Sequence, residues 1–268
     1  MKFTKILFVF IMLALVLPVF ALSLCPRCGY RIGFNDLKCK KCLKNLSPEL
    51  SQEKPTKSTI SVRIGEDCFI RHPHANNRAY KSDRNAGGDA QGEIGVWGGP
   101  STLRYLINFY TEEAAKMQNV DMEKFFPKKA TLYISAVKNK SNIEIPVAVY
   151  PVIHSFTAGV DRFRTREKPA KDCTWYYRST AMMWDIEGGD FDRRCVSRGV
   201  IRSGERNAVD VTEVIKYFFE KARIDGDYAF PGMIIMSDPG DRTVKSGFVT
   251  VYSFEADDYT LRPELFIE

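Results

Sequence analysis

The last third of the chain contains Thr174-Trp175, then Trp184, then Gly188-Gly-Asp-Phe-Asp192, then Asp210-Val-Thr212, and finally Arg262-Pro-Glu-Leu-Phe-Ile267. Aromatic and β-branched residues beside glycine, aspartate and proline are typical of short strands joined by tight turns. None of these pieces is specific alone. Together with a content of phenylalanine, tyrosine and tryptophan of 12%, they favour a protein built mainly of β-strands.

Ten segments, two of them in the stretches above, support this interpretation, because each alternates or is apolar and is bounded by turn residues. They are Ile60–Ile64, Cys68–Arg71, Ile94–Trp97, Leu103–Phe109, Thr131–Val137, Val147–His154, Thr174–Tyr177, Gly232–Met236, Phe248–Ser253 and Glu264–Ile267. So many short strands predict a mainly β fold, a two-sheet antiparallel jelly-roll sandwich over residues 60–268.

Two segments have helical periodicity instead. The first begins at Thr111 and runs to Phe125, and the second covers residues 211–222, with Asp210 as its cap and Gly226 as its stop. The polar stretches 73–92 and 185–205 are predicted to be long loops, where binding residues usually lie on a rigid β scaffold.

The positive charge of the chain is concentrated near the N-terminus. The 268 residues have a formal net charge of +6, but residues 22–59 hold eight basic and three acidic residues. Residues 60–268 hold 29 basic and 30 acidic ones. We therefore expect no nucleic-acid partner, because that function needs a basic face on the main domain.

The first 21 residues have the pattern of a secretory signal peptide. Lys2 and Lys5 precede the apolar run Ile6–Leu17, and Pro18-Val-Phe-Ala21 follows it. This order of basic, apolar and small residues predicts export, so the rest is expected to be secreted, periplasmic or on the cell surface. The alternative is an uncleaved membrane anchor, because the apolar run extended to Leu24 is marginally long enough to span a bilayer.

Two C-x-x-C pairs, Cys25-Pro-Arg-Cys28 and Cys39-Lys-Lys-Cys42, follow with ten residues between them. Each pair places two thiolates on one tight turn, and two pairs complete a tetrahedral zinc site. We predict a small structural zinc ribbon over residues 22–44 and a linker over residues 45–59, which contain two prolines and three serines. Two disulfides are the alternative, because export leads to oxidising surroundings.

Seven motifs of the predicted β domain occur in the order found in one known family. They are Asp67-Cys-Phe-Ile70, Leu103-Arg-Tyr-Leu-Ile-Asn-Phe109, Ala130-Thr-Leu-Tyr-Ile134, the segment 174–192, Asp210-Val-Thr212, Tyr252-Ser-Phe-Glu255 and Arg262-Pro263. Residues 62–268 therefore resemble the DNRLRE domains, also called disaggregatase-related repeats, and the related alginate-binding carbohydrate-binding modules. Asn108 and Tyr110 depart from the family pattern, which has arginine and aspartate there.

The resemblance implies an exported, non-catalytic module that binds acidic polysaccharide at the cell surface or in the extracellular matrix. One alternative is a structural envelope or matrix protein without glycan affinity, whose zinc ribbon docks a protein partner. The other is a polysaccharide-degrading enzyme. We disfavour an enzyme because no spacing marks a catalytic carboxylate pair and no G-x-S-x-G motif occurs.

The candidate ligand contacts are basic and aromatic. Three arginines alternate at 162, 164 and 166, so an extended strand would present all three on one face. A row of guanidinium groups suits the spaced carboxylates or sulfates of an acidic glycan, whereas the alternative is a solvated surface. The predicted contacts are Arg162, Arg164, Arg166, Arg193, Arg194 and Trp97. Trp175 and Trp184 are expected in the core.

Further candidates are acidic or contain sulfur. Asp190 and Asp192 beside two glycines resemble an oxygen-rich turn that can hold calcium, with Asp67 as a third ligand. The alternative is a tight turn whose carboxylates cap backbone amides. Cys173 and Cys195 can pair around this turn, which leaves Cys68 as the odd cysteine.

Overall fold

The computed structural model describes residues 59–72, 86–96, 102–139, 142–159, 172–180, 182–241 and 247–268, and the backbone of four short strands nearer the N-terminus. The chain divides into two compact units, Met1–Leu50 and Ser51–Glu268, at a point inside the predicted linker. The predicted signal peptide lies outside the described residues. Among the helices that are described, none has the length and apolar content needed to cross a bilayer.

The first unit contains two antiparallel pairs of two-residue strands. In one pair, β1 (Ser23–Leu24) lies beside β2 (Arg31–Ile32), and in the other, β3 (Lys38–Cys39) lies beside β4 (Lys44–Asn45). The side chains of this unit, including those of the predicted zinc ligands, lie outside the described residues.

The second unit is built around a seven-stranded antiparallel sheet. Its order is β13-β10-β15-β8-β7-β16, and β6 pairs with the edge of β8 opposite β15. The strands are β6 (Gly65–Arg71), β7 (Gln91–Val96), β8 (Thr102–Phe109), β10 (Glu144–Pro151), β13 (Ser197–Arg202), β15 (Met233–Ser237) and β16 (Gly247–Tyr252). The central strands β8 and β10 read as nearly continuous apolar runs because both of their faces are buried.

A four-stranded antiparallel sheet completes the unit, in the order β14-β9-β17-β5. It consists of β5 (Ile60–Val62), β9 (Ala130–Ser135), β14 (Arg206–Asp210) and β17 (Glu264–Ile267). Buried Glu264 accepts hydrogen bonds from Ser61, Arg63 and Arg206, so this one carboxylate ties β17 to both β5 and β14. Burial acts to raise the pKa of Glu264, but Arg63, Ser61 and Arg206 hold it below its usual value.

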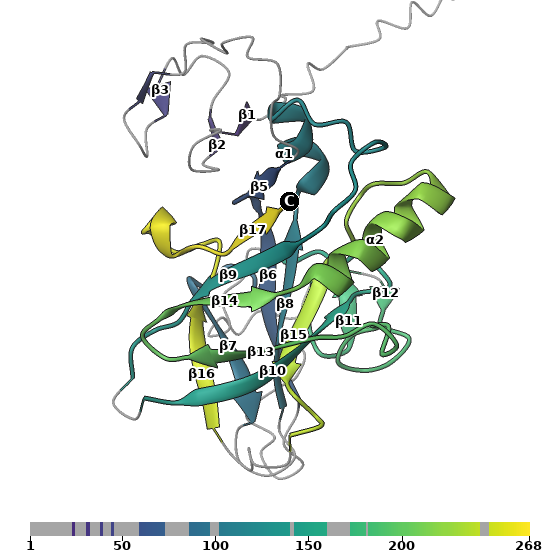
Figure 1. Ribbon diagram of the computed structural model, residues 1–268. Helices are drawn as coiled ribbons and strands as arrows, with labels where there is room; N and C mark the ends of the chain where they lie inside the picture. The colour runs from purple at the N-terminus through teal and green to yellow at the C-terminus, as the bar shows by residue number, and fades with distance from the viewer. Residues whose placement is uncertain are drawn as a thin grey trace, which may run out of the picture. The chain divides into compact units, whose positions relative to one another are not determined.

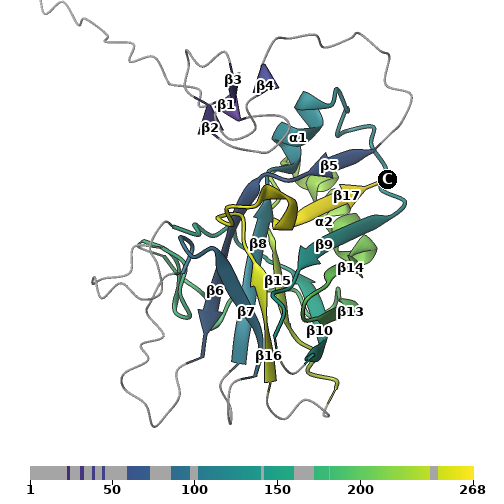
Figure 2. The same ribbon diagram turned by 90° about the vertical axis from the view of Figure 1, so that its left-hand side faces the viewer.

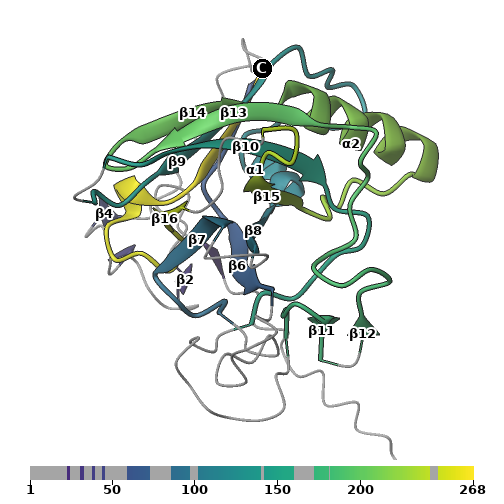
Figure 3. The ribbon, with the colours of Figure 1, turned by 90° about the horizontal axis from the view of Figure 1, so that it is seen from below.

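The two sheets are joined at several places, and the larger one is curled. A short turn connects β13 to β14, and beyond the end of β9, Ala136 pairs with Val251 of β16. Strands β6, β7, β8 and β16 run side by side (Figures 1 and 2), whereas β10 and β13 lie on the opposite side of the curl (Figure 3). The prediction of a mainly β, antiparallel fold is therefore confirmed.

Helix α2 (Thr212–Asp225) lies against β10, with β9 and β13 beside it (Figure 1). Its buried side chains, Val214, Ile215, Phe218, Phe219 and Ala222, form the apolar stripe that the sequence predicts. The Asp210 carboxylate accepts a hydrogen bond from the Thr212 amide, and Gly226 ends the helix in the left-handed conformation. The predicted stop at Gly226 is confirmed, whereas the N-cap residue is Val211 rather than Asp210, and the helix continues for three residues beyond Ala222.

Helix α1 (Thr111–Met117) is shorter than predicted, because the helix does not continue to Phe125. Tyr110, rather than Thr111, is the residue before its first turn. The Gln118 side chain donates to the carbonyl groups of Ala114 and Ser61, and Asn119 has a φ of 55°, outside the range of a right-handed helix. These local bonds end the helix after two turns.

Two predictions near the tryptophans are wrong. Residues 174–176 do not form a strand, because the Thr174 hydroxyl accepts from the amides of Tyr176 and Tyr177 and turns the chain. The hairpin strands β11 (Tyr177–Ser179) and β12 (Met182–Met183) follow instead. The predicted loop 185–205 contains the whole of β13, whose exposed arginines hide the alternation of the strand.

Candidate functional site

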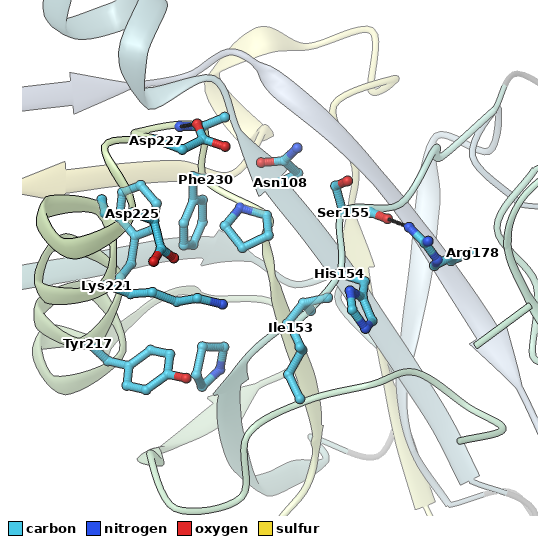
Figure 4. Close-up of a pocket in the computed structure, with 16 residues that line it drawn as sticks. Asn108, Ile153, His154, Ser155, Arg178, Tyr217, Lys221, Asp225, Asp227 and Phe230 are labelled. Atoms are coloured by element: carbon cyan, nitrogen blue, oxygen red, sulfur yellow. Dashed lines mark hydrogen bonds between the residues drawn. The ribbon is translucent and has the colours of Figure 1, made fainter. Parts of the chain in front are cut away.

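A pocket of about 400 Å³ lies where β10 ends against α2, and it is the candidate functional site (Figure 4). Its walls are residues 151–155, one face of α2, the segment 227–231 after the helix, Asn108 of β8, and Arg178 of β11. Binding pockets for small ligands typically measure 300–1,000 Å³, so this pocket is large enough to hold a small molecule or one unit of a polymer.

Helix α2 supplies both polar and apolar parts of the wall. Tyr217, Lys221 and Asp225 follow one another at four-residue spacing and therefore share one face of the helix. The buried Phe218 ring packs edge-on against Phe230, with 4.9 Å between the ring centroids. The pocket thus has an apolar surface of two aromatic rings below a row of polar groups.

Two cations face the pocket from opposite sides (Figure 4). Among the described residues, the exposed Lys221 ammonium group has neither an ion pair nor a hydrogen bond. Arg178 donates to the carbonyl oxygen of Ser155 and to the sulfur of Met182, both at 3.2 Å, and meets no carboxylate in the described part of the chain. Neither cation therefore forms an ion pair with a described acid, although Asp225 and Asp227 also line the pocket.

Asn108 adds an acceptor to the same pocket. Its side chain is buried, its amide hydrogen-bonds the Glu66 carboxyl group, and its Oδ1 atom has no partner within the described ranges. A buried oxygen without a hydrogen bond costs about 1–3 kcal/mol. A ligand hydroxyl or amide that donates to this oxygen would recover that cost.

A possible metal-ligating group borders the pocket. Among the described residues, His154, Asp185 and Asp190 are the one group of three whose ligand atoms lie within 4.8 Å of one another. The His154 Nε2 and Asp185 Oδ2 atoms are 3.5 Å apart. Asp190 is buried, and its two carboxylate oxygens accept from the amides of Asp185 and Ile186 at 2.8 and 2.6 Å.

Asp192 anchors the preceding loop to α2. Its carboxylate accepts two hydrogen bonds from the Arg194 guanidinium group, at 2.6 and 3.0 Å, and one from the Tyr217 hydroxyl at 2.9 Å. The side-chain hydrogen bond from Arg194 lowers the pKa of Asp192 far below its usual range, with the Arg194 amide and Tyr217 adding to the effect. This contact holds Tyr217 in the pocket wall.

A second cluster of cations and rings lies beside this loop. The Arg104 guanidinium group lies 4.6 Å from the Trp175 ring centroid and donates to the carbonyl oxygen of Gly188. The Arg193 guanidinium lies 5.4 Å from the Phe191 ring. Burial and the positive charge of Arg193 lower the pKa of Arg104 to about 10. Trp175 itself is buried, as is Trp184, so the prediction that both pack in the core is confirmed.

The residues singled out in the sequence do not meet at one place among those described. Arg162, Arg164, Arg166 and Trp97 lie outside the described residues. Arg193 and Arg194 are present, but Arg194 is engaged by Asp192 and Arg193 stacks on Phe191. The predicted calcium ligands Asp67, Asp190 and Asp192 accept from separate backbone amides, and for Asp190 and Asp192 this is the amide capping expected as the alternative to calcium.

The sequence did not point to Asn108, Lys221 or Tyr217 as site residues. Asn108 was noted only as a departure from a family pattern, and Lys221 and Tyr217 belong to the polar side of a helix, which is usually solvated surface. Arg178 had a weak signal, because it ends the most basic stretch of the domain.

The structure does not contain the suggested Cys173–Cys195 disulfide, and the Cys173 thiol hydrogen-bonds that of Cys68 instead. Cys68 and Cys173 are buried, whereas Cys195 is partly exposed. Proximity in sequence to the glycine turn misled the prediction, because the segment around Cys173 folds back onto β6.

The chain was compared with known proteins. No protein-family model matches the sequence, and no curated protein matches it significantly.

Proposed function

We propose that this protein is an exported, non-catalytic module that binds an acidic polysaccharide, and that the pocket beside α2 holds one acidic sugar unit. The observation that carries the proposal is the pair of cations, Lys221 and Arg178, that face the pocket without a carboxylate partner among the described residues. A ligand carboxylate or sulfate beside either cation would receive charge-assisted hydrogen bonds, which are stronger than hydrogen bonds between neutral groups.

The remaining pocket groups suit a sugar ring. Asp225 and the unpartnered Asn108 oxygen are acceptors for sugar hydroxyl groups, and the Phe218 and Phe230 rings supply apolar surface. A site that combines acceptors, cations and aromatic surface fits an acidic sugar better than a neutral apolar ligand. Arg162, Arg164, Arg166, Arg193, Arg194 and Trp97 remain the proposed contacts for neighbouring units of the polymer.

Calorimetric titration with alginate oligosaccharides tests the proposal, with neutral dextran as the reference polymer. Lys221→Gln and Arg178→Gln should each weaken alginate binding about ten- to hundredfold, because a lost hydrogen bond to a charged group is worth roughly 1.5–3 kcal/mol. Binding should also weaken between 50 and 500 mM salt, since exposed charges are screened.

Two matched variants serve as controls. Lys216→Gln removes a lysine of the same helix that is paired with Glu213, and Arg202→Gln removes an arginine paired with Glu144. Neither residue lines the pocket, so both should leave affinity unchanged. Absence of binding to every acidic polymer at low salt would refute the proposal and favour the alternative of a structural envelope protein. Binding lost only in a triple Arg162, Arg164 and Arg166 to Gln variant would move the ligand to the arginine row.

We further propose that the main unit is a jelly roll of the DNRLRE type. The two antiparallel sheets and the curl of the larger one support this assignment. A crystal structure whose strand connections differ from those of a jelly roll would remove it.

The structural zinc ribbon at Cys25, Cys28, Cys39 and Cys42 is a proposal as well. Its support is the position of the two C-x-x-C pairs. The first pair lies between β1 and β2, and the second begins at the last residue of β3 and ends before β4. Metal analysis of the unreduced protein should find one zinc per chain. Two disulfides and no zinc would exclude the ribbon.

Calcium at the acidic residues Asp67, Asp190 and Asp192 stays a prediction. Of these three residues, Asp190 has a carboxylate that lies near two other side chains able to bind a metal, Asp185 and His154. A thermal shift on adding calcium that disappears in Asp190→Asn would support a bound ion. No shift at millimolar calcium would exclude it at the concentrations of extracellular sites.

A further inference from the structure

Two buried thiols meet in the core of the main unit. Cys68 lies on β6 and Cys173 lies just before Trp175, more than one hundred residues further along the chain. Both are fully buried members of one apolar cluster that also contains Ile70 and Trp175. Neither is bonded to another cysteine, although the two thiols hydrogen-bond each other.

Hydrogen bonds of the backbone amides hold the two segments that carry these cysteines together, independently of the thiols. The Cys173 amide donates to the carbonyl oxygen of Thr157 at 2.8 Å. Ala158, which follows Thr157, donates its amide to the Glu66 carboxylate at 3.0 Å. The segment 157–158 therefore bridges the chain around Cys173 to β6, two residues before Cys68. The pair is held by three segments that are distant in sequence.

We propose that Cys68 and Cys173 form a disulfide bond in the exported protein. The reaction is thiol–disulfide exchange with a disulfide oxidant, for which glutathione disulfide is the probe. One thiolate attacks the oxidant and forms a mixed disulfide, and the second cysteine displaces the remaining glutathione. The oxidant's S–S bond breaks, one protein S–S bond forms, and both protons leave on two glutathione thiols.

The buried position sets the timing of the reaction. Burial raises the pKa of the Cys68 thiol well above its usual value, and the neighbouring Cys173 adds to this effect. Little thiolate is then available once the core has closed, so the exchange occurs during folding. After closure the bond is shielded from reductants, as expected of a structural disulfide in an exported protein.

The disulfide bond would also restrict the motion of the segment that carries Arg178, one wall of the pocket. Cys173 begins the segment that includes Thr174 and ends in Arg178, which donates to Ser155 beside the pocket. The link would tie this segment to β6, the second strand of the main unit. The inference depends on export for its oxidant and not on glycan binding, so the two proposals fail separately.

Trypsin separates the three cysteines of the main unit, which makes peptide mapping decisive. Cleavage after arginine and lysine yields 64–71 with Cys68, 172–178 with Cys173, and 195–198 with Cys195. The full chain without residues 1–21 is refolded with reduced and oxidised glutathione, unfolded in iodoacetamide, and digested without reduction. We expect 64–71 linked to 172–178, and an alkylated 195–198. A link between 172–178 and 195–198, or alkylation of all three peptides, would overturn the proposal.

Melting temperatures measured with and without a reductant during refolding give a second readout. Oxidised protein should melt roughly 5–15 °C above reduced protein, from the usual effect of a disulfide on a domain of this size. The double variant C68A/C173A should lose this difference, whereas C195A should keep it. A difference that persists in C68A/C173A would assign the effect to the N-terminal cysteines and contradict the proposal.

Discussion

Asp67 is the residue whose environment departs furthest from what its sequence suggested. It was a predicted calcium ligand, but its side chain is buried and accepts from the Phe254 amide at 2.7 Å. Burial raises the pKa of Asp67 to about 7, and the charges of Glu255 and Glu66 add to the rise. A carboxyl group that is half protonated near neutral pH is a poor ligand for a hard cation.

The Asp67→Asn variant tests this environment. A raised folded-state pKa means that the carboxyl group destabilises the fold increasingly as pH rises from about 4 to about 7, and by a constant amount above that. Asparagine retains the acceptor for Phe254 and cannot ionise. Relative to wild type, the variant should therefore gain on the order of 2–4 kcal/mol of unfolding free energy between pH 4.5 and pH 8. Urea unfolding at both pH values measures the gain, and an equal difference at the two would contradict it.

The same residue shows why candidate sites resist prediction from the sequence. Aspartates beside glycines suggest metal ligands by residue type, but only the fold decides which backbone amides reach them. The Asp190 and Asp192 carboxylates accept hydrogen bonds from the amides of Ile186 and Arg194. Lys221 shows the converse, because nothing in a helical pattern distinguishes a lysine in a pocket wall from one in solvent.

At the scale of elements, helix α2 was predicted well because its signals are local. An apolar stripe, an aspartate before the first turn and a glycine after the last are all contained within seventeen residues. Strand β13 was missed because its arginines Arg198 and Arg202 are exposed, and because its partners in β10 lie about fifty positions earlier in the chain. Long-range pairing of this kind leaves no local signal.

The stop of α2 gives a prediction at this scale. Gly226 has a φ of 73°, and a methyl group added there would meet no atom within 4 Å. Gly226→Ala should therefore destabilise the unit by about 1 kcal/mol through backbone strain alone. Gly226→Asn should cost less, because asparagine tolerates the left-handed conformation. Thermal unfolding followed by circular dichroism compares the variants, and equal losses for alanine and asparagine would show that strain is not the cause.

At the scale of the whole molecule, composition and strand count were enough for the fold class but not for the topology. The curl of the larger sheet depends on the pairing of Ala136, just after the end of β9, with Val251 of β16. The pocket in turn depends on how the residues after β10 approach α2. Both are arrangements of distant segments, and the motifs of the last third of the chain carry no information about them.

The division into two units yields the last prediction. Every described strand of the two large sheets lies between Ile60 and Ile267, so the main unit should fold without the cysteine-rich segment. Removal of residues 22–58 should change its melting temperature by less than about 2 °C, which corresponds to under about 1 kcal/mol for a unit of this size. Calorimetry of the two forms measures this, and metal analysis should show that the proposed zinc is lost with the segment. Loss of the main transition would show that the first unit stabilises the second. A change in oligomeric size alone would support a docking role for the ribbon.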